Sequence, residues 1–158
     1  MLSLRGFGVP PAADVGVGTA TVHLPRHTRG AGQVPASLTA TAGPGLSLMT
    51  EALGLAVAAE LPVVVVDVMR GGPSTGIPAK SEQSDIAIAT SGLHGDAPRL
   101  VLAPNSIADC LATTEWAVQL AEALQAPAIV LSDQFMGQSR AIIDRPQYES
   151  KPAQRLVA

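Results

Sequence analysis

Five polar side chains able to bind a ligand lie on one short stretch that begins with a run of valines. Val63–Val66 reads as a strand buried on both faces, because four consecutive valines suit the centre of a covered parallel sheet. The polar residues that follow it are Asp67, Arg70, Ser74, Thr75 and Lys80. Carboxylate, guanidinium, hydroxyl and amine groups gathered in this way indicate ligand binding.

The backbone of this stretch predicts an irregular loop after the strand. Its glycines give conformational freedom, and its prolines fix φ and remove two hydrogen-bond donors. These residues are Gly71, Gly72, Pro73, Gly76 and Pro78. Ligands bind at the carboxyl ends of the strands in open α/β sheets, so we interpret residues 70–80 as the functional loop.

The rest of the chain predicts an α/β fold, with a parallel sheet of about four strands and crossover helices. The strands are expected at residues 37–41, 63–68, 99–103 and 127–133. Helices are expected at residues 46–60, at 81–90 and after Ser106, where Ser106 and Asp109 resemble a capping box. The alternation of strand and helix implies right-handed parallel crossovers.

The two ends of the chain differ from this regular middle. Residues 1–36 are rich in Gly and Pro without a persistent period, which predicts an irregular, flexible segment. Residues from 134 onward show no clear period, and 147–158 are expected to form a tail. His23 and His27 have the spacing of a helical metal pair, but Pro25 lies between them, so we expect no metal site there.

Composition narrows the possible partners and compartment. The 158 residues suit one domain, and 47% hydrophobic residues can supply a core. A net charge of −3 argues against nucleic-acid binding. Cys110 is the only cysteine, which excludes a disulfide or a thiolate cluster within this sequence, and we expect it to be a small buried residue. No apolar run has membrane-spanning length, so we expect a cytoplasmic domain with no membrane partner.

Two nucleotide-binding motifs are only partly present. Gly43-Pro44-Gly45 begins a dinucleotide fingerprint and Asp67 could bind a ribose, but Leu48 replaces the third glycine. Residues 71–76 have the outer spacing of a P-loop without its lysine. A nucleotide-binding α/β module stays an alternative, and the incomplete fingerprint predicts no binding of NAD(H).

Two long segments, Thr41–Gly54 and Asp67–Gly76, resemble the α-subunit of 2-oxoacid:ferredoxin oxidoreductases, most closely the 2-oxoglutarate type. The resemblance covers residues 38–133 and continues through His94–Asp96, Arg99–Pro104 and Val130–Gln134. It implies that residues 37–146 are part of the domain that holds the aminopyrimidine ring of thiamine diphosphate.

The resemblance also implies a reaction and its partners. The family decarboxylates a 2-oxoacid oxidatively to an acyl-CoA and passes the electrons to ferredoxin. In the family, a partner β-subunit holds the diphosphate, Mg²⁺ and a [4Fe–4S] cluster, so we expect neither metal in this chain.

Specific residues take roles by the same resemblance. Arg70 matches the arginine that binds the substrate carboxylate, which a guanidinium does through two parallel hydrogen bonds. Thr75 would add a hydroxyl near the substrate, and Gly43-Pro44-Gly45 would let the backbone approach the cofactor ring. Each assignment has a plainer alternative. Arg70 could pair with Asp67 or Glu82, and the Thr75 hydroxyl could bond within its own loop. Gly43-Pro44-Gly45 could be an ordinary strand-to-helix turn. Ala79 stands where relatives often carry Thr, which leaves the choice of oxoacid open.

The family's catalytic glutamate has no counterpart in this sequence. That residue activates the cofactor from a preceding strand–helix unit, and residues 1–36 contain no glutamate. We therefore expect no catalytic residue here and no activity from the isolated chain. A non-catalytic truncated remnant or an assembly partner stays a further alternative.

Overall fold

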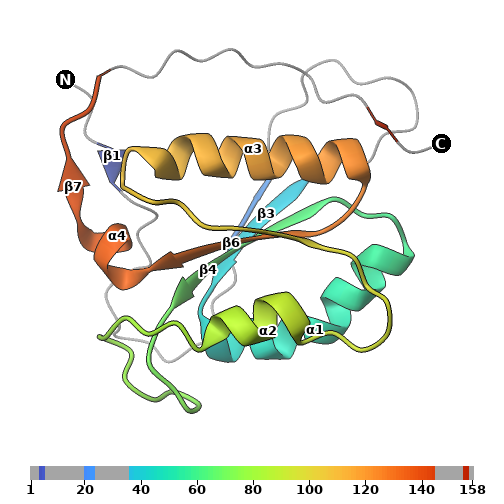
Figure 1. Cartoon of the computed structure of the whole chain (residues 1–158), viewed down its shortest axis with the longest axis horizontal. Coiled ribbons are helices and arrows are strands. Elements are labelled where there is room, and N and C mark those ends of the chain that lie inside the picture. The colour runs from blue at the N-terminus through green and yellow to red at the C-terminus, as the bar shows by residue number, and fades with distance from the viewer. Residues whose placement is uncertain (1–3, 6–19, 24–35, 145–154, 157–158) are drawn as a thin grey trace.

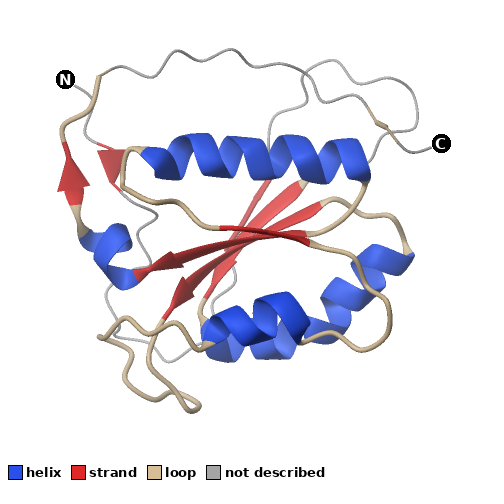
Figure 2. Ribbon diagram, in the orientation of Figure 1, coloured by secondary structure: helices blue, strands red, loops and turns tan. Residues whose placement is uncertain are grey.

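The computed structural model describes residues 4–5, 20–23, 36–144 and 155–156. Its strands are β1 (Leu4–Arg5), β2 (Ala20–His23), β3 (Ser37–Thr41), β4 (Val63–Met69), β5 (Leu100–Leu102), β6 (Ala128–Asp133) and β7 (Arg140–Ala141). Its helices are α1 (Gly43–Ala58), α2 (Asp85–Ser91), α3 (Asp109–Leu124) and α4 (Gln134–Gln138). The main sheet has the order β2-β3-β4-β6-β5, with α3 on one face and α1 and α2 on the other (Figures 1 and 2).

The predicted parallel sheet is confirmed. Strands β3, β4, β6 and β5 are all parallel, and each of the four lies within or close to its predicted range. Thr41 of β3 is in register with Asp67 of β4, which is in register with Leu131 of β6. The carboxyl ends of these strands therefore form one edge of the sheet.

Strand β4 is buried on both faces, as its valines predicted. Val64, Val66 and Val68 pack in the core beneath α3, whereas Val65 and Met69 pack beneath α1 and α2. Because side chains alternate along a strand, Asp67 must point toward α1 and α2.

The segment before residue 37 contains two strands that the sequence did not predict. β2 pairs antiparallel with β3, and β1 pairs antiparallel with β7. These strands depend on partners distant in sequence, which supply the backbone hydrogen bonds that no local period could reveal. The predicted flexibility of residues 6–19 and 24–35 lies outside the described residues.

Two helices begin at other residues than predicted. α1 starts at Gly43 rather than residue 46, so Gly43-Pro44-Gly45 is the first helical turn. Proline is well suited there, since its missing N–H would have no helical acceptor. α2 starts at Asp85 rather than residue 81, and Ser84 makes no capping hydrogen bond.

The segment after β6 also corrects the prediction, because α4 and β7 lie where irregular structure was expected. Asp133 caps α4, and its Oδ1 accepts a hydrogen bond from the Met136 N–H at 2.8 Å. A strong N-cap explains how so short a helix forms without a hydrophobic period.

The predicted cap of α3 is only partly present: Ala108, just before the helix, makes no side-chain capping bond, but Ser106 and Asp109 make hydrogen bonds in the turn that leads into α3. Ser106 Oγ accepts from the Asp109 N–H at 3.2 Å, and the Asp109 carboxylate accepts from the Asn105 N–H at 2.9 Å. The buried side of α3 consists of small residues, which let the helix lie close to the sheet: Cys110, Thr113, Thr114, Ala117 and Ala121. Cys110 is buried as expected, and burial raises the pKa of its thiol.

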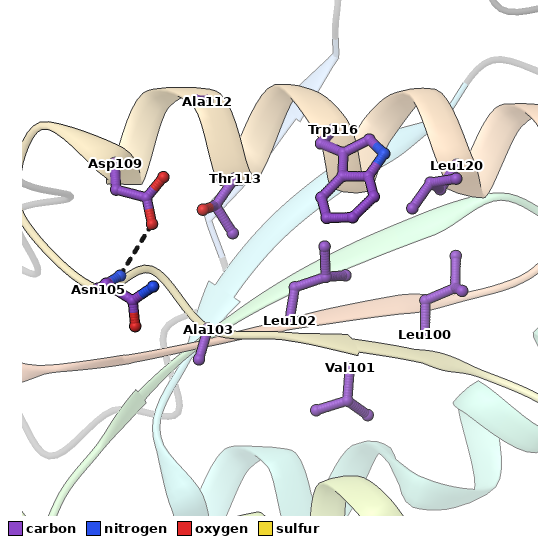
Figure 3. A pocket seen from close by; sticks show the side chains of 10 residues that line it. All are labelled: Leu100, Val101, Leu102, Ala103, Asn105, Asp109, Ala112, Thr113, Trp116 and Leu120. Atoms are coloured by element: carbon purple, nitrogen blue, oxygen red, sulfur yellow. Dashed lines mark hydrogen bonds between the residues drawn. The ribbon is translucent and has the colours of Figure 1, made fainter.

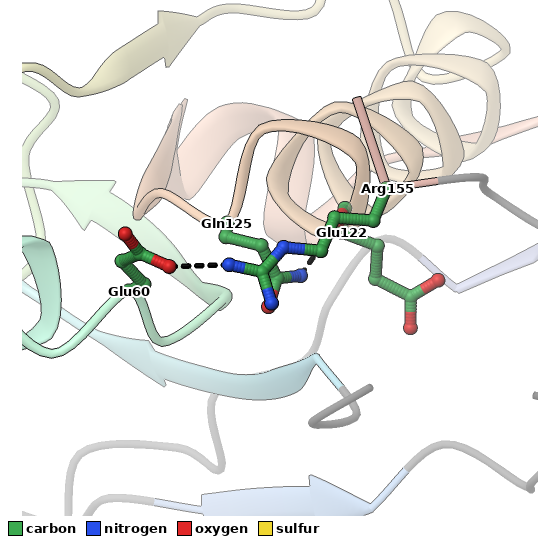
Figure 4. Close-up of polar contacts among 4 residues, drawn as sticks. All are labelled: Glu60, Glu122, Gln125 and Arg155. Atoms are coloured by element: carbon green, nitrogen blue, oxygen red, sulfur yellow. Dashed lines mark hydrogen bonds and ion pairs between the residues drawn. The ribbon is translucent and has the colours of Figure 1, made fainter. Parts of the chain in front are cut away.

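Contacts at the opposite, amino edge of the sheet fasten residues 155–156 to the domain. Arg155 pairs with Glu60, which follows α1 (Figure 4). The Leu156 N–H donates to the Ala123 carbonyl at 2.8 Å. Gln125, just before β6, donates through Nε2 to the Glu122 carbonyl at 2.7 Å. These contacts stabilise the edge away from the predicted site.

Candidate functional site

The carboxyl edge of the sheet brings together two of the predicted site segments. The Gly43–Gly45 turn follows β3, and Arg70 follows β4. Because β3 and β4 are adjacent and parallel, both segments leave the sheet at the same edge. The cofactor-binding and substrate-binding predictions thus refer to one place on the molecule.

The first turn of α1 is closely packed at both of its glycines. A Cβ at Gly43 would overlap the Asp85 carboxylate, and a Cβ at Gly45 would overlap Thr41 Oγ1. These contacts give both glycines a packing role that the sequence did not reveal. The first helical hydrogen bond runs from the Leu46 N–H to the Ala42 carbonyl, so the N–H groups of Gly43 and Gly45 have no helical acceptor.

Arg70 is half-buried at the end of β4 and is not neutralised by either expected partner. No ion pair joins it to Asp67 or Glu82. Its Nε is buried without a hydrogen-bond acceptor among the described residues. Glu82 instead accepts a hydrogen bond from the Gly72 N–H at 3.0 Å. A half-buried arginine that no described acid neutralises is suited to an anionic ligand.

The loop after Arg70 is a closed, irregular turn, as predicted. The Gly71 N–H donates to the Lys80 carbonyl at 2.9 Å, and the Ile77 N–H donates to the Gly71 carbonyl at 3.0 Å. Gly76 has φ +42°, and a Cβ there would overlap the Gly71 carbonyl. Thr75 is exposed on this loop, and no hydrogen bond joins it to Arg70 or to the loop. Its substrate-binding role stays a prediction.

A pair of buried acids, Asp67 and Asp85, lies beneath this edge. The sequence pattern did not predict that these two residues form a pair. Asp67 has no exposed surface, and Asp85 is 5% exposed. Burial, and then the charge of Asp85, raise the pKa of Asp67 to about 8. Burial also raises the pKa of Asp85, which a backbone hydrogen bond from Arg70 partly offsets. The sequence signal was an aspartate inside a strand of valines.

The burial of Asp67 argues against the nucleotide-binding alternative. A ribose-binding acid must reach the hydroxyl groups of its ligand, and a fully buried carboxyl cannot do so.

The structure has a cavity of about 630 Å³ elsewhere, between β5 and α3 (Figure 3). Its lining is mostly apolar and includes Leu100, Leu102 and Trp116. None of the predicted site residues lines it, so this cavity is separate from the candidate site.

Comparison with known proteins assigns the family. The family model described as "Pyruvate flavodoxin/ferredoxin oxidoreductase, thiamine diP-bdg" matches residues 31–156. The chain belongs to this family. Its α/β fold and its membership therefore agree with the resemblance seen in the sequence. The match extends beyond residues 37–146 at both ends, and the predicted domain limits stay a prediction.

The similar proteins are oxidoreductase subunits. The chain is 54% identical over 96 residues to the 2-oxoglutarate oxidoreductase subunit KorA of Mycobacterium tuberculosis, covering 61% of this chain and 15% of that protein. It is 47% identical over 109 residues to the 2-oxoglutarate synthase subunit KorA of Methanothermobacter marburgensis, covering 69% and 29%.

A solved structure agrees with this result. It is the 2-oxoglutarate:ferredoxin oxidoreductase from Magnetococcus marinus with 2-oxoglutarate, coenzyme A and succinyl-CoA bound. The identity is 54% and the TM-score 0.67, over 70% of this chain and 19% of that chain. The chain thus spans less than a third of the length of these similar proteins.

The residues at the carboxyl edge fit one wall of a thiamine diphosphate site. The N–H groups of Gly43 and Gly45, which have no helical acceptor, and the half-buried Arg70 side chain are the polar groups that such a wall could offer. In the described part of the chain, no group of three or more His, Cys, Asp or Glu residues could hold a metal ion. The structure describes His23 but not His27, so that pair lies outside the described residues. No described helix is long and apolar enough to cross a bilayer.

Proposed function

We propose that the chain is part of the α-subunit of a 2-oxoacid:ferredoxin oxidoreductase, with 2-oxoglutarate as the oxoacid. The observation that carries this proposal is Arg70, which is half-buried, is not neutralised by an acid in the described part of the chain, and leaves the sheet beside the first turn of α1. The names of the similar proteins support the choice of 2-oxoglutarate. The reaction would be oxidative decarboxylation to an acyl-CoA, with the electrons passed to ferredoxin.

Each residue of the edge has a distinct task in this proposal. Arg70 binds a carboxylate of the oxoacid by two parallel hydrogen bonds, and the Thr75 hydroxyl adds a contact near the substrate. Gly43, Pro44 and Gly45 lie against the aminopyrimidine ring of thiamine diphosphate. When bound, that cofactor supplies the carbon nucleophile and the electron sink for decarboxylation. The proposed β-subunit holds the diphosphate, Mg²⁺ and a [4Fe–4S] cluster, and no metal is assigned to this chain.

The chain's own residues bind and orient in this proposal, and none is assigned to proton transfer on the cofactor. The complete complex is therefore defined as these 158 residues, the segment or polypeptide that supplies the glutamate, and the β-subunit. We expect 2-oxoglutarate-dependent reduction of a viologen dye by the complete complex, with CoA present. The 158-residue chain and the β-subunit alone should give none.

Two results of this assay would count against the proposal. Robust turnover without a source of the glutamate would show that the cofactor is activated differently. The proposed activity would also be refuted if the complete complex, assembled and loaded with cofactor, failed to reduce the dye with every 2-oxoacid tested.

A further inference from the structure

Asp67 and Asp85 have buried carboxyl oxygens with no donor to bind. Both oxygens of Asp67 and Oδ2 of Asp85 are buried without a hydrogen-bond partner among the described residues. Two carboxylates can only accept, so neither can satisfy the other. A single proton changes this, because a protonated carboxyl of Asp67 can donate to Asp85.

Asp85 joins this pair to both parts of the candidate site. Its carboxylate lies against Gly43, where a Cβ would overlap it, and it accepts a hydrogen bond from the Arg70 backbone. One carboxyl group therefore contacts the first turn of α1 and the end of β4. The strand, the turn and α2 meet at this group.

Few other charges act on the pair. Arg70 and Glu82 are the charged neighbours that influence Asp85. On the other adjoining elements, Glu51 of α1 is at the surface, 3.9 Å from His94, and Asp133 of β6 caps α4. No cation pairs with Asp67 or Asp85 in the described part of the chain, so a proton is the simplest way to neutralise one of them.

We propose that Asp67 and Asp85 share one proton, carried by Asp67, and that this acid pair positions Arg70 and the Gly43 turn. Asp67 and Asp85 are positioning residues, because they act through Arg70 and Gly43. Loss of the proton leaves two adjacent buried negative charges, which repel each other and weaken the support for both segments. The consequence for 2-oxoacid binding rests on the proposed function, whereas the shared proton does not.

The shared proton can be measured in the 158-residue chain by NMR with ¹³C-labelled aspartate carboxyl groups. One aspartate signal should remain that of a protonated acid at pH 7 and change near pH 8. It should be absent from Asp67→Asn and present in Asp144→Asn, an exposed control. If every aspartate carboxyl of the folded wild-type chain is ionised by pH 6, the proposal is wrong.

The positioning role is tested in the complete complex by the pH dependence of the apparent KM for 2-oxoglutarate. Asn at position 67 is a permanent donor, so Asp67→Asn should keep the wild-type KM at pH 7 and lose the rise expected above pH 8. Asp67→Leu cannot donate and should raise the KM about ten-fold at pH 7, with the KM for CoA little changed.

Three outcomes distinguish a failure of the positioning role from a failure of the proposed oxidoreductase function. Equal KM values for Asp67→Leu and wild type, in a folded complex, would overturn the positioning role. A rise in KM above pH 8 that is as large in Asp67→Asn as in wild type would do the same. A complex without oxidoreductase activity whose chain still shows the protonated signal would refute the proposed function and leave the acid pair intact.

Discussion

Single residues at the carboxyl edge are fixed by packing as much as by ligand chemistry. Gly43 and Gly45 were predicted from resemblance to face a cofactor ring, and the structure adds that each also faces a side chain of its own domain. A glycine can serve both purposes, because the absence of a Cβ leaves one side open to a neighbour and the backbone open to a ligand.

The packing role of Gly45 predicts a specific loss of stability. Gly45→Ala should lower the free energy of unfolding by about 1–3 kcal/mol, because the new methyl group overlaps Thr41 Oγ1 in a buried setting. Gly54→Ala is the matched control in the same helix. No atom lies within 4 Å of a Cβ there, so this change should stabilise the chain by about 0.5–1 kcal/mol. Urea unfolding of both variants measures the difference, and equal effects would contradict the packing role.

Asp67 predicts how the stability of the chain depends on pH. Its pKa of about 8 in the folded chain exceeds the ordinary value of 3.8, so the folded chain holds a proton that the unfolded chain releases. The stability that this proton gives is complete below about pH 4 and is lost as the pH rises through about 8. Between pH 6 and 9 the wild type should lose about 2–3 kcal/mol more than Asp67→Asn. The free energies of unfolding of wild type and Asp67→Asn are measured with urea at each pH. If they change equally with pH, Asp67 is ionised in the folded chain.

At the scale of elements, the sequence predicted what depends on local pattern and missed what depends on distant partners. The four parallel strands followed from apolar runs bounded by turns, and the loop after Arg70 followed from its glycines and prolines. Strand β2 could not be predicted, because its reason for forming is the free edge of β3. The acid pair was missed for the same reason, since α2 had to be placed against β4 before Asp85 met Asp67.

The cap of α3 gives a prediction for one element. Ser106→Ala removes the side-chain acceptor of the Asp109 N–H, leaving only the Ser106 carbonyl at 3.1 Å, and should destabilise the chain by about 0.5–2 kcal/mol. Ser81→Ala, at an exposed serine with no hydrogen bond in the described structure, should change stability by less than about 0.5 kcal/mol. Thermal unfolding followed by circular dichroism compares the two. A loss no larger at 106 than at 81 would mean that the cap does not stabilise α3.

At the scale of the whole molecule, the candidate site lies at the carboxyl edge of the sheet, and the contacts of residues 155–156 lie at the amino edge. At the amino edge of the sheet, Arg155 pairs with Glu60 and the Leu156 N–H donates to the Ala123 carbonyl. The carboxyl edge carries Arg70 and the Gly43 turn, with the acid pair beneath them. The chain spans less than a third of its similar proteins, so this edge is one part of the larger proposed site.

The most direct test of the proposed function is the apparent KM for 2-oxoglutarate in the complete complex with Arg70→Lys. Lysine keeps the charge but loses the paired hydrogen bonds, so the KM should rise about ten-fold or more while the KM for CoA stays nearly constant. Arg140→Lys, at an exposed position on β7, is the matched control and should change neither value. Equal changes in both KM values for Arg70→Lys, or none, would contradict the assignment of Arg70 to the oxoacid.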